Sequence, residues 1–309
     1  MSTTRRRRLF RSSLYAILLV VGVGLIVSWV VAGALVSPAS RRVGPPPQDL
    51  NAVAFTTVSE SGSSIAGWHT KPTDCKGVVV LLHGIYGSRV SMLQRAQLLH
   101  AEGLATVMID LQAHGESPGK SITVGHLEKH DVRAAVEFAR KKHPGQPIGV
   151  IGVSLGGAAA LLASPLNIDA LVIESVYPDV DAAIHNRVAA RLGPLSVLPA
   201  ELLLLQLEPR LGVSRSELRP IDHIRNVDCP VLVASGTADL HTTGLETQAI
   251  FEAAPDPKEL WLVEGAAHVD LLRFKKVEYL DRVVAFLKRH LDFDNARSSE
   301  LDAVDPEEL

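Results

Sequence analysis

The chain has 309 residues, a hydrophobic fraction of 47% and a formal net charge of −3. This hydrophobic fraction is ordinary for a packed globular domain and excludes a chain that is disordered throughout. The near-neutral charge, with a sequence pI of about 6.5, gives no reason to expect a nucleic-acid partner. The length suits one large α/β domain or two small ones.

The first element in chain order is a long apolar segment at residues 14–36, which contains no charged residue. As a helix it would be about 35 Å long at ~1.5 Å per residue, enough to cross a hydrocarbon core of about 30 Å. It is longer than the ~7–15 apolar residues typical of a signal peptide, which favours a transmembrane helix. Cleavage to a secreted protein stays open as the alternative, because small residues occur at Ala32, Ala34 and Ala39.

Charges on either side of this segment predict its orientation. Residues 1–13 contain five arginines, whereas only Arg41 and Arg42 follow closely. The positive-inside rule makes residues 1–13 a cytoplasmic basic segment and places the rest of the chain outside the cytoplasm, as a single-pass membrane protein. Residues 37–51 contain three consecutive prolines and are predicted to form a stiff linker that lifts the next domain off the bilayer.

From residue 52 onward, short apolar strands alternate with helices. The strands are expected at 52–58 and 64–70, which form a hairpin, and at 77–82, 104–109, 148–153, 170–173, 231–234 and 260–263. The helices are expected at 91–101, 126–142, 155–164, 243–253 and 276–290. Continuous apolar runs suit strands that are covered on both faces. The alternation therefore predicts one α/β domain over residues 52–294, with helices on both faces of a mostly parallel sheet.

One segment of this domain interrupts the alternation. Residues 177–220 show no clear strand, and residues 199–211 form a strongly apolar helical stretch. A connection of this length is too long for a simple loop, so we expect a short helical cap over the C-terminal edge of the sheet. An ordinary core helix is the alternative. Residues 295–309 are polar and acidic and are predicted to form a loose acidic tail.

A glycine-rich motif follows the strand at 148–153. Residues 152–157 read GVSLGG and begin a helix, which is the setting of the nucleophile elbow G-x-S-x-G. In such a turn, a side chain at Gly152 or Gly156 would collide with its neighbours, and the helix N-terminus favours negative charge beside Ser154. A serine that merely caps the helix is the alternative. The glycines do not match the G-x-G-x-x-G pattern of dinucleotide binding.

A serine nucleophile needs a histidine base that is oriented by an acid. In this arrangement the chain order is Ser, then Asp or Glu, then His. Asp239 comes shortly after the strand at 231–234, and His268 comes shortly after the strand at 260–263. Both residues should lie at the same sheet edge as Ser154. The sequence therefore predicts a catalytic triad of Ser154, Asp239 and His268.

Two other acids lie near these positions. Glu174 ends the strand before the cap and is the rival acid, but we expect it to be buried and hydrogen-bonded near the site. Asp270 is too close in sequence to His268 to approach its ring from behind. We therefore prefer Asp239.

The tetrahedral oxyanion of acyl transfer needs hydrogen-bond donors, each worth about 3 kcal/mol of the barrier. The backbone N–H of Leu155, next to the nucleophile, is one candidate. The backbone N–H of Ile85, in the loop after the strand at 77–82, is the other. His83 in the same loop and His114 after the next strand are expected to be buried structural histidines rather than bases.

Taken together, these motifs resemble the α/β-hydrolase family over roughly residues 52–291. The shared features are His-Gly after one strand, D-x-x-x-H-G-x-S after the next, GVSLGG, a late Asp and GAAH. The resemblance implies an eight-stranded, mostly parallel sheet and hydrolysis of esters, thioesters or amides without a cofactor. The cap and the N-terminal helix are most similar to membrane-tethered esterase and acylglycerol-lipase-like branches. The turn at 110–117 reads DLQAHGES, whereas many members carry arginine and glycine before His-Gly, so the residue that shapes this turn stays open.

The sequence thus predicts a membrane-anchored serine hydrolase that acts on a small-molecule acyl ester or lipid. Amide, peptide or thioester hydrolysis is the nearest alternative, and a catalytically silent binding protein of the same fold is an alternative of another class. No metal is expected, because Cys75 and Cys229 lack the spacing of a zinc site. A Cys75–Cys229 disulfide is the less favoured alternative to two free thiols, since their strands are not expected to be neighbours.

Overall fold

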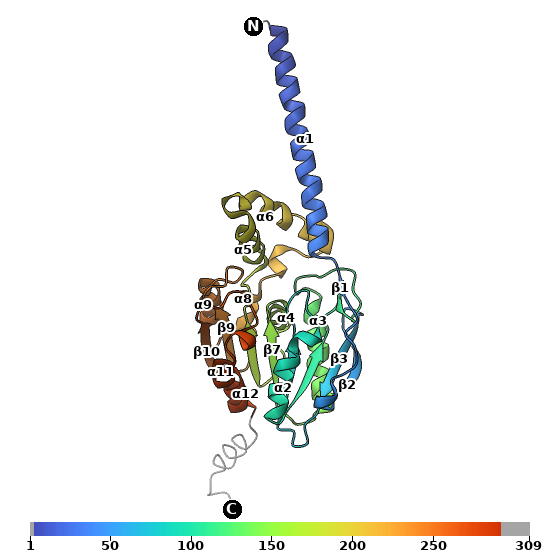
Figure 1. Cartoon of the computed structure of the whole chain (residues 1–309), viewed down its shortest axis with the longest axis vertical. Helices are drawn as coiled ribbons and strands as arrows, with labels where there is room; N and C mark the ends of the chain where they lie inside the picture. Colours follow the sequence, from blue (N-terminus) through green and yellow to red (C-terminus); the bar gives the residue numbers. More distant parts are fainter. Residues whose placement is uncertain (1–2, 292–309) are drawn as a thin grey trace, which may run out of the picture.

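The computed structural model describes residues 3–291, and its centre is an eight-stranded sheet (Figure 1). The strand order is β10-β9-β8-β7-β4-β5-β3-β2. The strands are β2 (Val53–Val58), β3 (Ser64–Thr70), β4 (Gly77–Leu82), β5 (Leu104–Ile109), β7 (Ile148–Val153), β8 (Ala170–Glu174), β9 (Val231–Gly236) and β10 (Lys258–Val263). Only β2 and β3 run antiparallel to their neighbours. The expected mostly parallel sheet and its N-terminal hairpin are confirmed.

Helices cover both faces of this sheet. They are α2 (Leu93–Ala101), α3 (Glu128–Lys142), α4 (Leu155–Ala163), α9 (Gly244–Ala253), α10 (Leu271–Phe274), α11 (Lys276–Tyr279) and α12 (Ala285–His290). The helix expected at 276–290 contains a π-helical turn at Leu280–Val284 between α11 and α12. The remaining expected helices differ from the structure by at most two residues at their ends.

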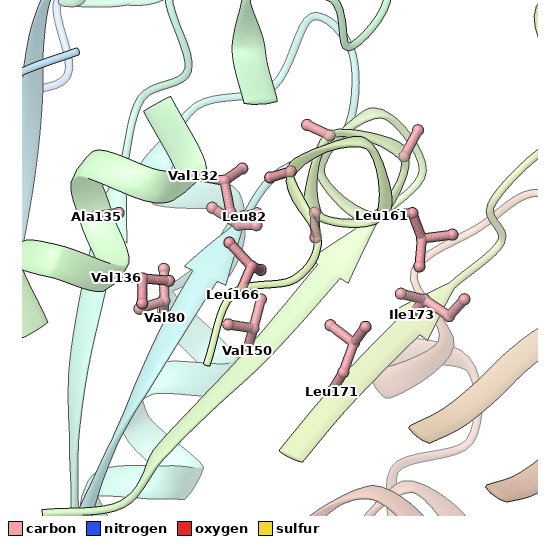
Figure 2. Packing of buried hydrophobic residues seen from close by; sticks show 14 of the residues in the cluster. Val80, Leu82, Val132, Ala135, Val136, Val150, Leu161, Leu166, Leu171 and Ile173 are labelled. Carbon is pink, nitrogen blue, oxygen red and sulfur yellow. The ribbon is translucent and has the colours of Figure 1, made fainter. Parts of the chain in front are cut away.

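Strand β4 shows why these strands have no polar face. Val80 and Leu82 belong to the core cluster that includes residues of α3, α4 and α9, and Figure 2 shows them beside Val132 and Val136 of α3. Leu81, which points to the other face, belongs to the cluster with residues of α2 and α12. Successive side chains of a strand point to opposite faces, so a strand between two helical layers must be apolar throughout.

The segment between β8 and β9 is helical. It contains α5 (Val180–Leu192), α6 (Val197–Leu204), α7 (Leu207–Leu211) and α8 (Pro220–His223), and we call α5 to α7 the cap. The single helix expected at 199–211 is two helices, because Pro209 has no N–H to donate to the carbonyl of Leu205. Leu162 of α4 packs with Leu204, Leu207 and other buried residues of this segment, so the cap rests on the helix that follows Ser154.

An N-terminal helix, α1 (Thr3–Leu35), extends far beyond the domain (Figure 1). Its part from Ser13 to Leu35 is 23 residues long and apolar enough to cross a membrane, and none of its most apolar stretch is buried in the structure. The expected apolar helix is therefore present, with the length and composition of an anchor or of a signal sequence.

The predicted stiff spacer at residues 37–51 is not a spacer. β1 (Ala39–Ser40) pairs in parallel with β6 (His114–Gly115), and the N–H of Arg41 donates to the Gly115 carbonyl at 2.8 Å. Leu50 is buried in the core. The segment therefore packs against the domain instead of extending freely, because its backbone groups gain hydrogen-bond partners there. The predicted tail at 295–309 and the end of the 52–294 domain lie outside the described residues.

Candidate active site

Ser154 occupies a sharp turn between β7 and α4. Its φ and ψ are 49° and −111°, a conformation that L-residues adopt at a cost of about 1–3 kcal/mol. Neighbouring glycines make the turn possible: a Cβ on Gly152 would lie 2.5 Å from the Cα of Gly157, and one on Gly156 would lie 2.6 Å from the Leu82 carbonyl oxygen. The N–H of Ser154 donates to the Glu174 carbonyl at 2.8 Å. The structure therefore has the strained strand-turn-helix geometry that the motif predicts.

Asp239 and His268 form a hydrogen-bonded pair at the same sheet edge. Nδ1 of His268 lies 2.7 Å from Oδ2 of Asp239, while Oδ1 of Asp239 accepts the N–H groups of His241 and Thr242 at 2.8 and 2.9 Å. Burial would raise the pKa of Asp239, but the hydrogen bond and charge of His268 and the two backbone donors outweigh it and lower that pKa. Asp239 is thus an ionised, fully bonded carboxylate behind the imidazole.

The loops that carry this pair are bonded directly to each other. The N–H of Ala238 donates to the Ala266 carbonyl at 2.9 Å, and the N–H of Gly265 donates to Oγ1 of Thr237 at 2.9 Å. A Cβ on Gly236 would lie only 2.0 Å from the Ala266 carbonyl oxygen. This close approach follows from the pairing of Gly236 with Val263 at the ends of β9 and β10. The relative position of acid and histidine is therefore fixed by backbone contacts.

Ser154 is 4% exposed, and its Oγ has no hydrogen-bond partner among the described residues. The structure thus brings Asp239 and His268 into contact and places Ser154 on the same edge, but it has no hydrogen bond between Ser154 and His268. In hydrolases this bond is often long until substrate binds. The complete triad therefore remains a prediction.

The loop after β4 lies beside the serine. A Cβ on Gly84 would be 3.6 Å from the Cβ of Ser154. The backbone N–H groups of Ile85 and Leu155 donate to no other group of residues 3–291 and are free to bind an oxyanion. His83 is fully buried; its Nε2 accepts the N–H of Leu111 at 3.1 Å, and its Nδ1 donates to the Gly84 carbonyl at 2.8 Å. Burial lowers the pKa of His83 to about 3, so it is a neutral structural residue, as expected.

Arg95 of α2 is a buried cation that the sequence analysis missed. Its Nη2 lies 2.6 Å from Oε2 of Glu174, and its Nη1 lies 2.9 Å from Oδ2 of Asp270. The hydroxyl of Tyr279 donates to Oε1 of Glu174 at 2.6 Å. Glu174 is therefore buried and hydrogen-bonded, as expected, and Asp270 binds Arg95 rather than His268. An arginine in an amphipathic helix gives no sequence signal of such a role.

The turn whose shape the sequence left open is organised by Asp110 and Arg89. The carboxylate of Asp110 accepts the N–H groups of Arg89 and Glu116 at 2.6 and 2.8 Å and pairs with the Arg89 guanidinium, which also pairs with Glu116. His114 is fully buried, with Nδ1 3.0 Å from the Gln112 carbonyl, and it is a structural residue, as expected. Arg89 had no sequence signal, since its partners are more than twenty residues away.

Within the described part of the chain, no group of three or more His, Cys, Asp or Glu side chains is arranged to hold a metal ion. Cys75 and Cys229 are both free thiols, so the disulfide alternative is wrong. Burial is the main cause that raises the pKa of the Cys229 thiol, to about 12. Neither cysteine belongs to the site.

Comparisons with known proteins agree with this geometry. A family model described as Serine aminopeptidase, S33, matches residues 73–198. The solved structure of the Pyrococcus furiosus esterase Pf2001 has a TM-score of 0.69 and 26% identity, and the match covers 83% of this chain and 100% of that one. The chain belongs to the α/β-hydrolase superfamily. This α/β-hydrolase has esterase-like structural neighbours.

Two curated relatives of this α/β-hydrolase are informative. The uncharacterized protein YqkD of Bacillus subtilis is 27% identical over 248 residues, which is 78% of this chain and 80% of YqkD. The monoacylglycerol lipase of Mycolicibacterium smegmatis is 38% identical over 90 residues, which is 28% of this chain and 32% of the lipase. The match to YqkD thus covers most of the chain, whereas the match to the lipase covers less than a third of it.

Proposed function

We propose that this α/β-hydrolase is a serine hydrolase of carboxylic esters, with Ser154 as nucleophile, His268 as base and Asp239 as the acid that orients the base. The observation that carries the proposal is the strained Ser154 turn on the same sheet edge as the 2.7 Å Asp239–His268 hydrogen bond. A positive φ at a buried non-glycine residue persists only where surrounding structure enforces it, and such strain is concentrated at functional sites.

The reaction then proceeds through an acyl-enzyme. Nε2 of His268 takes the Ser154 proton as Oγ attacks the acyl carbonyl carbon, and Asp239 stabilises the resulting imidazolium. The N–H groups of Ile85 and Leu155 bind the oxyanion, where removal of one donor typically costs about 3–4 kcal/mol of transition-state stabilisation. The imidazolium protonates the leaving alcohol. Water, deprotonated by His268, then attacks the acyl-enzyme, releases the carboxylic acid and restores Ser154.

The description of the matching family makes amide or peptide hydrolysis the second candidate. An aminopeptidase must bind a cationic amino group beside the scissile bond, which favours anionic partners. Among the charged side chains of the cap, Arg187 and Arg191 act on His241, two residues after Asp239. After burial, Arg187 is the largest cause that lowers the pKa of His241. Asp239 acts on the same imidazole with the opposite sign, so a comparison of ester and amide substrates separates the two candidates.

The apolar helix α1 supports a membrane location. As part of this proposal, α1 crosses the bilayer once, residues 1–13 are cytoplasmic and the hydrolase domain is extracytoplasmic. Near such a surface, a lipid or other long-chain acyl ester is the favoured substrate. The partial match to a monoacylglycerol lipase supports this substrate class.

A fluorophosphonate probe tests the nucleophile. We expect the folded full-length chain to be labelled and Ser154→Ala to lose the label. Ser175→Ala is a matched control, because Ser175 follows the neighbouring strand β8, has a φ of 51°, is 3% exposed and has an unpartnered Oγ. Label that persists in Ser154→Ala, or folded protein that takes no label, would overturn the proposal in favour of another nucleophile or a silent binding protein.

A panel of acyl esters and matched amides then tests the substrate class. We expect ester hydrolysis to exceed amide hydrolysis and kcat/KM to rise with acyl chain length. Faster cleavage of aminoacyl amides than of esters would instead support the aminopeptidase candidate.

A further inference from the structure

The cap presents large apolar side chains to the outside. Leu195 is 80% exposed and Val197 is 64% exposed, although both lie in a segment that packs other leucines inward. We call these exposed residues the cap face: Leu192, Leu195, Val197, Leu198 and Leu205. Residues 192–198 contain no charged residue. Contiguous exposed apolar side chains of this kind mark an interaction surface.

Specific contacts fix the cap against the last turns of α1. Nε2 of Gln206 donates to Oγ of Ser28 at 2.8 Å, and Nη2 of Arg210 donates to the Trp29 carbonyl at 2.6 Å. The Arg210 guanidinium also lies 4.1 Å from the centre of the Trp29 ring. A Cβ on Gly33 would lie 3.0 Å from the same guanidinium. The cap is thus held at a defined level along the apolar helix.

That level lies within the candidate span. Ser28 is seven residues before Leu35, where the span and α1 end, and is therefore about 10 Å deeper at ~1.5 Å per residue. Amphipathic elements that lie in a membrane interface bury their apolar faces about 5–10 Å below the headgroups. Figure 1 shows α6 at the end of the domain from which α1 departs.

From this arrangement we infer that the cap face inserts into the lipid interface of the bilayer that α1 crosses, so that the active site receives its substrate from the membrane. The inference rests on the proposed membrane span and deepens the proposed function by naming bilayer-embedded esters as the substrate class. A second copy of the chain is a less suitable occupant of the cap face, because at this depth the surrounding medium is lipid.

The polar groups of the cap agree with this orientation. Glu201 of α6 pairs with Arg215 and His185, at 3.1 and 2.9 Å, and so is neutralised within the protein. Arg210 has a long apolar stem that can lie among lipid chains while its guanidinium is bound to the Trp29 carbonyl and ring. Glu201 therefore enters the interface paired, whereas Glu208 of α7 is exposed, has no ion pair among the described residues and has to stay at the headgroup level.

The cap also connects this surface to the catalytic edge. Nδ2 of Asn186 in α5 donates to Oε1 of Glu246 at 2.7 Å and to the His241 carbonyl at 3.4 Å, in the loop that follows Asp239. α5 leads directly to the cap face at Leu192. An acyl ester in the leaflet beside the cap face would then lie next to the helix that is bonded to the loop after Asp239.

A depth measurement on the full-length chain in phosphatidylcholine vesicles tests the inference without any need for activity. A polarity-sensitive dye is attached to Val197→Cys and, as matched control, to Val53→Cys. Both valines are 64% exposed, but Val53 begins β2 at the opposite end of the sheet. Treatment of the unsubstituted chain with the same dye measures the background labelling of Cys75. A dye on Val23→Cys in α1 reports insertion.

We expect nitroxide lipids to quench the dyes at Val23 and Val197 at least threefold more than the dye at Val53. Equal, weak quenching at Val197 and Val53 would overturn the inference. Failure to quench at Val23 would also overturn it, because it removes the membrane span on which the cap argument depends.

A second measurement compares a vesicle-embedded long-chain ester with a water-soluble short-chain ester. For Val197→Glu combined with Leu198→Glu, we expect the ratio of embedded to soluble hydrolysis to fall about tenfold, because charges oppose burial of the cap face. Val53→Glu should leave the ratio unchanged. An unchanged ratio in the double variant would contradict substrate delivery from the bilayer. If the unsubstituted chain hydrolyses neither ester, the proposed function is overturned, but the depth measurement still stands.

Discussion

The guanidinium of Arg95 lies 2.9 Å from the carboxylate of Asp270, two residues after His268. Because the same guanidinium binds Glu174 at the end of β8, it connects helix α2, the central sheet and the loop that carries the candidate base. Both contacts lie at the sheet edge that presents Ser154. Arg95 is therefore a positioning residue for this edge, although it contacts none of the proposed reacting atoms.

We predict that Arg95→Met lowers the free energy of unfolding by about 3–5 kcal/mol, because it leaves Glu174 buried without its cation. Chemical denaturation in detergent micelles measures the change. Lys288→Met is the control, since Lys288 pairs with Glu102 at 2.6 Å but is 54% exposed, and such pairs contribute less than about 1 kcal/mol. Equal losses in the two variants would contradict the role given to Arg95.

Gly156→Ala should destabilise the protein and suppress probe labelling of Ser154. The added Cβ would lie 2.6 Å from the backbone oxygen of Leu82, and overpacking of this kind costs about 1–3 kcal/mol. Gly244→Ala at the start of α9 meets no atom within 4 Å, so it should be neutral or stabilise by up to about 1 kcal/mol. Thermal unfolding and fluorophosphonate labelling compare the two variants. Equal stability and equal labelling would mean that the turn at Ser154 relaxes to accept the added Cβ.

Asp239→Asn should reduce kcat for ester hydrolysis by about 10³–10⁴, because a neutral amide cannot stabilise the imidazolium of His268. The fold should persist, since the amide oxygen can still accept the N–H groups of His241 and Thr242. Asp270→Asn is the control and should reduce kcat less than tenfold. Steady-state kinetics on a short-chain ester measures kcat for both variants. A similar loss of kcat in the two would contradict the orienting role given to Asp239.

Stability should depend on pH through Asp131 of α3. Burial raises the pKa of this carboxyl from 3.8 to about 7, only partly offset by hydrogen bonds from Gln112 and Ser59. Between pH 3.8 and about 7 the folded state then binds more protons than the unfolded state, so this group lowers stability as pH rises through that range. Asp131→Asn removes the ionisation, and its stability relative to the parent should be higher at pH 8 than at pH 5. Denaturation curves at both values check this, and the same difference at each pH would exclude the raised pKa.

Most of the sheet was predictable because covered parallel strands are apolar on both faces. The runs at β4 and β7 end at the loops that carry Ile85 and Ser154, so the sheet edge of the site followed from the strand ends. The order of Ser154, Asp239 and His268 then predicted the dyad that the structure contains. These inferences used local pattern and topology alone.

The buried ion pairs and the position of the N-terminal segment were not predictable in the same way. Arg95 and Glu174 are 79 residues apart, and each is an ordinary charge in its own helix or strand. Likewise, the sequence of the proline-rich segment does not predict that Ala39 pairs with His114. Such partners depend on which surfaces meet after folding, and a single sequence does not contain that information.

The end of α1 also contacts the loop that carries Ile85. The hydroxyl of Tyr86, the neighbour of Ile85, donates to the Leu35 carbonyl at 2.5 Å, and the N–H of Ile122 donates to the Val36 carbonyl at 2.8 Å. A peptidase that cut after Val36 would remove these two tethers from the domain, together with the partner of Arg210. Shedding of the enzyme would therefore not yield the same catalyst in solution: it would free Tyr86 and expose a surface of the cap that the helix now covers.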